Sequence, residues 1–249
     1  MSRTARKKSS TNCYHIMLRG VNRSEIFFDD QDRRYFLKLL KHYAEKTNTL
    51  ILTYCLMHNH VHLLLQTETP GDLIKRIASG YVYYINHKYD RVGHLFQARF
   101  KSEPVEDEQY LLTVFRYILK NPQKAGICTV DKYRWSGYPE IGAEKGICDT
   151  RLIVSIAGGT EALLQFIKTE NNDECLEWDE PTRWTDQTAA DFVNQTAGIT
   201  NPILLRTLPK DFRNYCVHVS NQAGISIERL ARITDLSKST IYNILHSKK

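Results

Sequence analysis

The first half of the chain alternates between stretches whose apolar residues recur every second position and stretches where they recur every three or four positions. The strand-like stretches span 13–19, 50–57, 60–66 and 96–105. The helical stretches span roughly 30–47, 70–88 and 106–121. This β-α-β-β-α-β order, with one further helix, is the order of a ferredoxin-like fold. We therefore expect an α+β domain in which helices cover one face of an antiparallel sheet.

The pattern changes after about residue 140. Short helical pieces are expected near 150–158 and 160–170, and an acidic, polar stretch with the composition of a linker follows. Trp178 and Trp184 in that stretch indicate that parts of it dock on a surface. The sequence thus predicts an α+β domain of residues 1–140, a helical extension and acidic linker of residues 141–186, and an all-helical domain of residues 187–249.

The net charge of +6 is unevenly distributed along the chain. Residues 1–159 have a net charge of +8, residues 160–191 of −7 and residues 192–249 of +5. Two basic blocks on either side of an acidic block indicate two surfaces for a polyanion. Basic surfaces also occur in proteins that bind no nucleic acid, so charge alone does not assign the partner.

The composition favours a cytoplasmic protein without a membrane segment. The chain has no apolar run long enough to span a membrane, and its basic N-terminus lacks the apolar stretch of a secretion signal. The six cysteines are scattered and include no Cys-X-X-Cys pair. This spacing argues against a disulfide scaffold and against a zinc site made of thiolates.

The third strand-like stretch carries the first candidate chemistry. Its period of two places His60 and His62 on one face and Val61, Leu63 and Leu65 on the other. Two imidazoles at this spacing can bind one divalent metal ion. The alternative is a half-buried strand whose histidines are satisfied by hydrogen bonds, and the spacing alone does not decide between the two.

Tyr117 and Asn121 stand one turn apart on the third expected helix and therefore share a face. We expect this helix to end at Asn121, because Pro122 disfavours helical geometry in the residue before it. A carboxamide oxygen suits Mg²⁺ or Mn²⁺, and with the two imidazoles it gives a three-ligand site with open positions. A tyrosine beside such a metal could attack a phosphodiester that the ion activates. The alternative is that Tyr117 packs in a core and Asn121 only caps the helix.

Three segments carry a resemblance to a known family. They are Cys55–Leu65 (CLMHNHVHLLL), Gly93–Ser102 (GHLFQARFKS) and Tyr117–Gly126 (YILKNPQKAG). These segments resemble the single-tyrosine HUH transposases, and most of all the REP-associated tyrosine transposases. The resemblance covers roughly residues 10–170 and implies a ferredoxin-like fold. It also implies that single-stranded, hairpin-type DNA is cleaved and rejoined through a 5′-phosphotyrosine.

The resemblance assigns roles to individual residues. Tyr117 matches the nucleophile, His60 and His62 match the two metal-binding histidines, and Asn121 matches the polar residue that completes a site for Mg²⁺ or Mn²⁺. The family usually has proline where this chain has His58, so that His58, His60 and His62 form an HxHxH pattern. We expect His58 to lie in a turn and not to bind the metal. A zinc hydrolase built on all three histidines is the alternative.

Basic side chains near these motifs are candidates for contacts with the DNA backbone. They are Arg19, Arg23, Arg99 and Lys101, together with Arg3, Arg6, Lys7 and Lys8 of the N-terminal arm. We expect Arg99 and Lys101 to share one face of the fourth strand, which is also how a solvated edge strand looks. The tyrosines of the second helix could stack bases, but Tyr81 and Tyr84 are expected in the core.

The C-terminal residues 226–245 have the form of a helix-turn-helix. Ser226 and Ser237 are expected to cap two short helices joined by a turn at residues 234–236. The second helix would present a recognition surface to duplex DNA made of Lys238, Ser239, Thr240, Tyr242 and Asn243. The alternative is a helical hairpin that only packs.

These observations favour a metal-dependent DNA-nicking and strand-transfer enzyme with an appended domain that binds duplex DNA. The second hypothesis is a non-catalytic DNA-binding regulator derived from a transposase. The sequence leaves open whether the protein acts as a monomer or as a homodimer.

Overall fold

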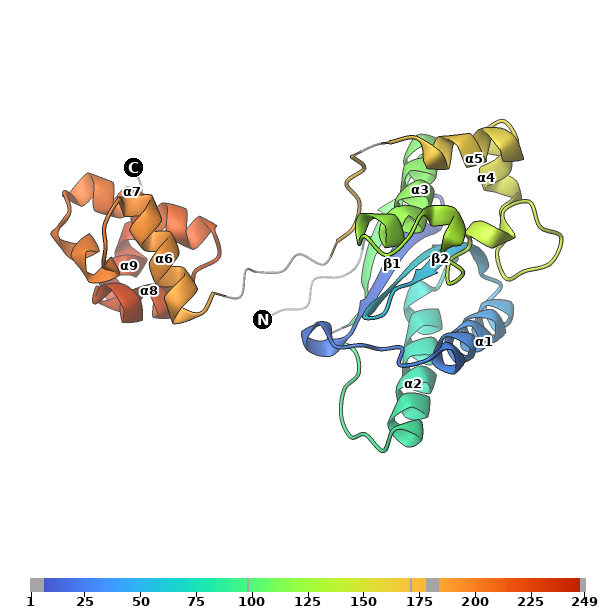
Figure 1. Ribbon diagram of the computed structural model, residues 1–249, viewed down its shortest axis with the longest axis horizontal. Coiled ribbons are helices and arrows are strands. Elements are labelled where there is room, and N and C mark those ends of the chain that lie inside the picture. Colours follow the sequence, from blue (N-terminus) through green and yellow to red (C-terminus); the bar gives the residue numbers. More distant parts are fainter. Residues whose placement is uncertain (1–6, 98, 171, 178–183, 247–249) are drawn as a thin grey trace. The chain divides into compact units, whose positions relative to one another are not determined.

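The computed structural model describes residues 7–97, 99–170, 172–177 and 184–246 (Figure 1). The chain divides into two compact units, residues 1–178 and residues 179–249. Among the described residues, no helix is both long and apolar enough to cross a membrane.

Unit 1 is built on a four-stranded antiparallel sheet. The strands are β1 (Cys13–Arg19), β2 (Leu50–Leu56), β3 (His60–Gln66) and β4 (Lys101–Val105), in the spatial order β2-β3-β1-β4. β1 is paired with β3 on one side and with β4 on the other. The expected ferredoxin-like α+β architecture is confirmed.

The fourth strand is shorter than the sequence pattern predicts. Phe96 forms an isolated bridge with Gly20, whereas Lys101 pairs with Met17. The chain has two more residues between Phe96 and Lys101 than β1 has between Met17 and Gly20, and this excess interrupts the ladder. The expectation that Arg99 and Lys101 share one strand face is thus wrong, because Arg99 lies outside the strand.

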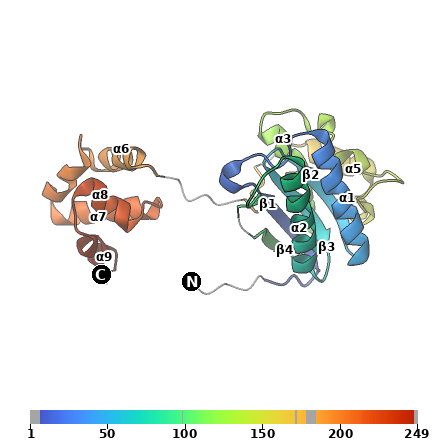
Figure 2. The same ribbon diagram turned by 90° about the horizontal axis from the view of Figure 1, so that it is seen from below.

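Helices cover both faces of the sheet (Figures 1 and 2). The helices α1 (Asp30–Lys46) and α2 (Pro70–Lys88) pack with Ile16 and Leu63 on one face. The helix α3 (Glu108–Lys124) packs with Leu52 and Leu64 on the other. The expectation of helices on one face is therefore wrong. The physical reason is visible in β3, where residues 61–65 are all buried, as in a strand that is covered on both sides.

The helix α3 continues past the point where the sequence predicts its end. It runs to Lys124 with Pro122 inside, and the backbone N–H of Ala125 donates to the carbonyl of Asn121 over 3.0 Å. A proline in the last turn removes only one backbone donor, and the turn is completed by the residues that follow. The expectation that the helix ends at Asn121 is wrong, but Asn121 keeps its place one turn after Tyr117.

Short elements complete unit 1. They are η1 (Val21–Arg23), η2 (Val130–Lys132), η3 (Tyr138–Glu140), α4 (Arg151–Ile156) and α5 (Thr160–Lys168). Ile153 of α4 and Leu163 and Ile167 of α5 extend the core on the α3 side of the sheet. The described residues after α5, 169–170 and 172–177, form neither helix nor strand.

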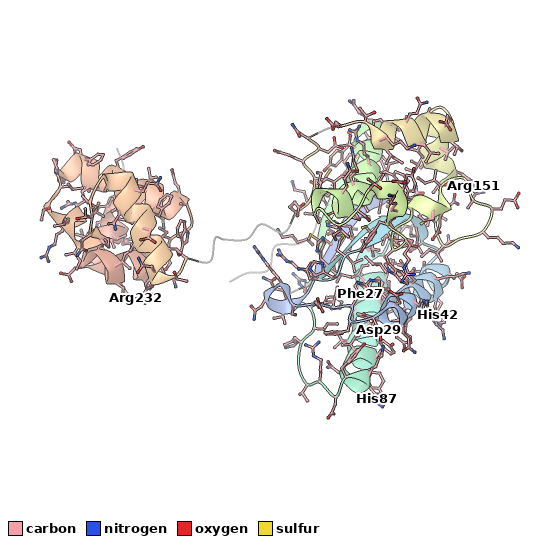
Figure 3. All side chains as sticks on the ribbon, viewed as in Figure 1. Phe27, Asp29, His42, His87, Arg151 and Arg232 are labelled. Atoms are coloured by element: carbon pink, nitrogen blue, oxygen red, sulfur yellow. The ribbon has the colours of Figure 1, made fainter. Side chains whose placement is uncertain are left out.

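Unit 2 is all-helical. Its elements are α6 (Asp186–Ala197), η4 (Pro202–Thr207), α7 (Lys210–Gln222), α8 (Ile227–Thr234) and α9 (Lys238–His246). Val193, Val217, Leu230 and Ile241, one from each α-helix, meet in its core. Arg232, which is labelled in Figure 3, forms an ion pair of 2.7 Å with Asp186 at the start of α6.

A buried carboxylate joins α1 to the end of α2. Asp29, labelled in Figure 3, caps α1 together with Asp32. The Asp32 side chain is fully buried, accepts from the backbone N–H of Phe28 over 2.9 Å and pairs with the Lys88 Nζ over 2.7 Å. A buried carboxylate needs such partners, because an unpaired charge inside a protein is costly.

Replacing Lys88 with methionine is expected to lower the free energy of unfolding by about 2 kcal/mol, because Asp32 stays buried without its cation. Urea denaturation measures the loss. The control is Arg76→Met, which removes an exposed ion pair with Asp72 and is expected to cost much less. Equal losses in the two variants would contradict the assignment of Asp32 as a buried, paired charge.

Candidate nucleic-acid processing site

Two predicted histidines lie on the face of the sheet that α3 covers. In the antiparallel register His60 stands opposite Arg19 and His62 stands opposite Met17. Their neighbours Val61 and Leu63 belong to the core on the opposite face, as the period of two requires. The His60 and His62 rings lie 5.0 Å apart between centroids and are nearly perpendicular, at 86°.

A third histidine completes this group. His15 on β1 is fully buried, and its Nε2 lies 2.9 Å from Nδ1 of His62, so that the two rings share a hydrogen bond. His15 is not among the residues predicted for the site from the sequence. Its signal was available, since His15 alternates with the core residues Tyr14 and Ile16 and must therefore point to the same face as His62.

Tyr117 and Asn121 of α3 lie against these histidines. The Tyr117 ring is 5.9 Å from the His62 ring and 5.9 Å from the His15 ring, in both cases nearly edge to face. The Asn121 side chain hydrogen-bonds to His60, and its Nδ2 donates to the Tyr117 carbonyl over 2.9 Å. The structure thus brings together, within one chain, four side chains from two segments that are far apart in the sequence.

Burial keeps the three imidazoles neutral. Desolvation lowers the pKa of His15 to about 3. Desolvation and, to a smaller extent, the nearby Arg19 lower the pKa of His60 to about 4. The pKa of His62 is also well below its usual value, first through burial and then through its neighbours. Neutral imidazoles keep a lone pair for a metal ion, and the buried Nε2 of His62 has no hydrogen-bond partner among the described residues.

His58 lies apart from this group. It is exposed in the turn between β2 and β3, and its carbonyl accepts from the backbone N–H of Ile26 over 2.9 Å. In the described part of the chain, no three His, Cys, Asp or Glu side chains are placed to hold a metal ion. This arrangement gives no support to a zinc site built on His58, His60 and His62.

The predicted DNA-contacting side chains of unit 1 have different surroundings. Arg19, at the end of β1, is half-buried close to His60, and Lys101 donates from Nζ to the Glu177 carbonyl over 3.1 Å. Arg23 is exposed in η1, and Arg99 borders a hollow of about 330 Å³ that α2, Phe96 and Phe100 also line. Lys7 and Lys8 are exposed, whereas Arg3, Arg6 and Trp178 lie outside the described residues.

An acidic side chain that the sequence analysis did not single out contacts the tyrosine. The Tyr117 hydroxyl donates to the carboxylate of Glu177. The Lys124 Nζ lies 4.2 Å from the centroid of the Tyr117 ring. For the acidic stretch that contains Glu177, the sequence predicts only a linker that ends at residue 186. Its contact with Tyr117 is a tertiary feature with no local sequence signal.

In unit 2, α8 and α9 are joined by a short turn. The N-cap Ser226 accepts from the backbone N–H of Arg229, and Ser237 accepts from that of Thr240. Asp235 provides the left-handed turn residue, with φ of 58°. Of the predicted recognition residues, Thr240 is half-buried and the following are exposed: Lys238, Ser239, Tyr242 and Asn243.

Comparison with known families decides what unit 1 is. Residues 8–121 match the family model described as "Transposase IS200 like". Unit 1 therefore carries an IS200-like transposase domain. The matched range includes the whole sheet and α3 as far as Asn121, so it contains His60, His62, Tyr117 and Asn121.

Other comparisons add little to this assignment. No curated protein matches the chain. Among solved structures, it is similar to one described as "Structure of the REP associates tyrosine transposase bound to a REP hairpin", with 17% identity and a TM-score of 0.48. That match covers 60% of this chain and 90% of the other.

The lowered histidine pKa values predict that the metal-free transposase domain loses stability in mild acid. Each histidine has a lower pKa folded than unfolded, so its contribution is complete above about pH 6.5 and is lost as the pH falls toward 4. We expect a loss of up to about 1.4 kcal/mol per pH unit for each histidine. Urea denaturation with a chelator present, at several pH values, measures this slope.

The matched variants are His15→Leu, which removes one buried imidazole, and His94→Gln, which changes an exposed one. The slope is expected to decrease in the first variant and to stay the same in the second. A slope that His15→Leu leaves unchanged would show that His15 is protonated equally in the folded and unfolded states.

Proposed function

We propose that the transposase domain cleaves and rejoins single-stranded, hairpin-type DNA through a 5′-phosphotyrosine formed on Tyr117. One observation carries the proposal: a tyrosine from α3 lies beside two strand histidines and an asparagine, in a group of which only His60 is half-buried and the rest are buried. A structural role alone would not require three imidazoles and a carboxamide in an otherwise apolar interior. In a transposase domain, this set is suited to phosphodiester chemistry.

A divalent metal ion, Mg²⁺ or Mn²⁺, is part of the proposal. His60, His62 and Asn121 would hold it, because two neutral imidazoles and a carboxamide oxygen are compatible ligands. The buried Nε2 of His62, which has no hydrogen-bond partner among the described residues, fits such a role. When bound, the ion polarises the phosphate and stabilises the leaving 3′ oxygen.

Tyr117 supplies the nucleophile. Its hydroxyl oxygen forms a bond to phosphorus while the bond between phosphorus and the 3′ oxygen breaks. The phenol proton passes to water, and the leaving 3′ oxygen takes up a proton. The phosphotyrosine retains the energy of the original bond, so a 3′ hydroxyl can reverse the reaction without a nucleotide cofactor. Packing of the Tyr117 ring against His15 and His62 restricts the phenol to one position, as a near-attack geometry requires.

The substitution Tyr117→Phe is expected to abolish covalent attachment to DNA and to retain DNA binding. The test uses single-stranded oligonucleotides with a fold-back hairpin and a 3′ label, since the protein would stay on the 5′ phosphate of the downstream strand. Adducts are read on a denaturing gel with Mn²⁺ present. Tyr110→Phe, on the same helix, is the control and should keep the adduct. A denaturant-resistant adduct with the Tyr117→Phe variant would rule out Tyr117 as the nucleophile.

His15 is expected to position His62 for metal binding. If Nε2 of His62 binds the ion, its Nδ1 carries the proton and donates to Nε2 of His15, which fixes the ring and its tautomer. We therefore expect His15→Leu to weaken Mn²⁺ binding roughly tenfold, and His62→Ala to weaken it more. Calorimetric titration of the DNA-free protein with Mn²⁺ measures this. An unchanged affinity in His15→Leu, with His94→Gln as control, would contradict the positioning role.

For unit 2 we propose binding of duplex DNA through the exposed side of α9, where Lys238, Ser239, Tyr242 and Asn243 lie. This surface also supports the second candidate function, a non-catalytic DNA-binding regulator. Manganese-dependent nicking of a hairpin oligonucleotide separates the two, because a regulator would bind DNA and leave it intact. The proposal does not need a homodimer to build the site, because His60, His62, Tyr117 and Asn121 lie together within one chain.

A further inference from the structure

The last turn of α3 extends the helix face on which two of the site residues lie. Because α3 continues through Pro122 to Lys124, the residues Tyr117, Asn121 and Lys124 stand at positions i, i+4 and i+7 of one helix. Side chains at this spacing share a face. If the helix ended at Asn121, as the sequence predicts, Lys124 would have no fixed place on that face.

Lys124 lies on the ring of the candidate nucleophile. Its Nζ is 4.2 Å from the centroid of the Tyr117 ring, and Tyr117 is buried whereas Lys124 is exposed. His15 and His62 pack on the same ring from the interior, so Lys124 borders it on the side nearer to solvent. An ammonium at this place lies beside the path of any phosphate that approaches the tyrosine.

The charge of Lys124 also reaches the proposed metal ligands. Burial is the first cause of the low pKa of His62, its histidine neighbours follow, and the Lys124 charge is a further cause. A cation close to residues that would bind Mg²⁺ or Mn²⁺ opposes metal binding, so the metal alone gives no reason for it. An anion that contacts both cations, such as a phosphate, does give one.

We propose that Lys124 is a catalytic residue, whose ammonium contacts the scissile phosphate and stabilises the negative charge that develops when Tyr117 attacks it. The inference rests on the proposed function, because it takes Tyr117 to be the nucleophile. It goes beyond that function in assigning a cation of the protein to the reacting phosphate. The bonds that form and break are those given above, and Lys124 keeps its proton throughout.

The chemistry of the step suits an ammonium at this position. As the phenol loses its proton to water, negative charge increases on the oxygens around phosphorus. A donor already placed beside these oxygens stabilises the transition state more than the ground state. In the reverse step the same contact stabilises Tyr117 as the leaving group. An ammonium has three N–H donors, and the Asp173 carbonyl accepts from the Lys124 Nζ over 3.0 Å, which leaves donors for a phosphate.

A purely structural role explains less of this arrangement. A lysine in the last turn of a helix can stabilise the helix by interacting with its last carbonyls. The Lys124 Nζ instead lies on Tyr117, two turns back, and donates outside the helix. Arg116 makes a similar contact with the Phe166 ring, over 4.0 Å, but its charge is paired with Asp173. Among the described residues, Lys124 forms no ion pair with a carboxylate.

The rate of adduct formation tests the proposal. The probe is the 3′-labelled hairpin oligonucleotide described above, with protein and Mn²⁺ at saturation and a single turnover observed. We expect Lys124→Gln to react roughly a hundredfold more slowly than wild type, because a donor to the developing charge is lost. Lys124→Arg should stay within about tenfold of wild type, since arginine keeps the charge and binds phosphate. The control Lys132→Gln removes an exposed lysine of η2 and should react like wild type.

Two affinities separate a catalytic from a structural role. Calorimetric titration of the DNA-free protein should show that Lys124→Gln binds Mn²⁺ at least as tightly as wild type, by up to about twofold, because a like charge is removed. Fluorescence anisotropy with a chelator present should show hairpin affinity within about threefold of wild type, because one phosphate contact among several is lost. A lysine that only holds the end of α3 predicts weaker Mn²⁺ binding when it is removed.

Three results would overturn the role of Lys124 while wild type forms the adduct. The first is a Lys124→Gln rate within about threefold of wild type. The second is an equal loss in Lys132→Gln, which would reflect net charge alone. The third is weaker Mn²⁺ binding in Lys124→Gln together with no recovery of the rate in Lys124→Arg. A wild-type protein that forms no adduct would instead contradict the proposed function itself, and this inference with it.

Discussion

The hydrogen bond between His15 and His62 is the interaction on which the candidate site depends. It joins the two central strands of the sheet on the face that α3 covers, at a place where neither ring reaches solvent. A buried polar group without a partner is costly, and a buried charge is costlier, so the pair is stable only as two neutral rings that face each other. Tyr117 packs on both rings. The position of the nucleophile therefore follows from how two imidazoles satisfy each other inside an apolar layer.

The sheet is covered on both faces, and this explains how such a site can be both buried and close to the surface. On the α1–α2 side the sheet presents apolar residues, whereas on the α3 side it carries the imidazoles at the beginning of β3, where Arg19 of β1 also lies. A helix that starts on the core and ends beside these groups places Asn121 within reach of His60. The same helix supplies Arg116, Lys120 and Lys124, whose side chains donate to Thr169 and Asp173 after α5.

Much of the fold and of the candidate site could be predicted from the sequence, because strands with a period of two, capped helices and short motifs leave local signals. Asp29 and Asp107 begin α1 and α3 as capping residues do, and His15 could have been found by following the alternation of β1. Glu177 could not have been found in this way, because sixty positions of sequence separate it from Tyr117, which it contacts. The place of α3 on the second face and the shortened β4 likewise depend on distant partners, which only the tertiary fold supplies.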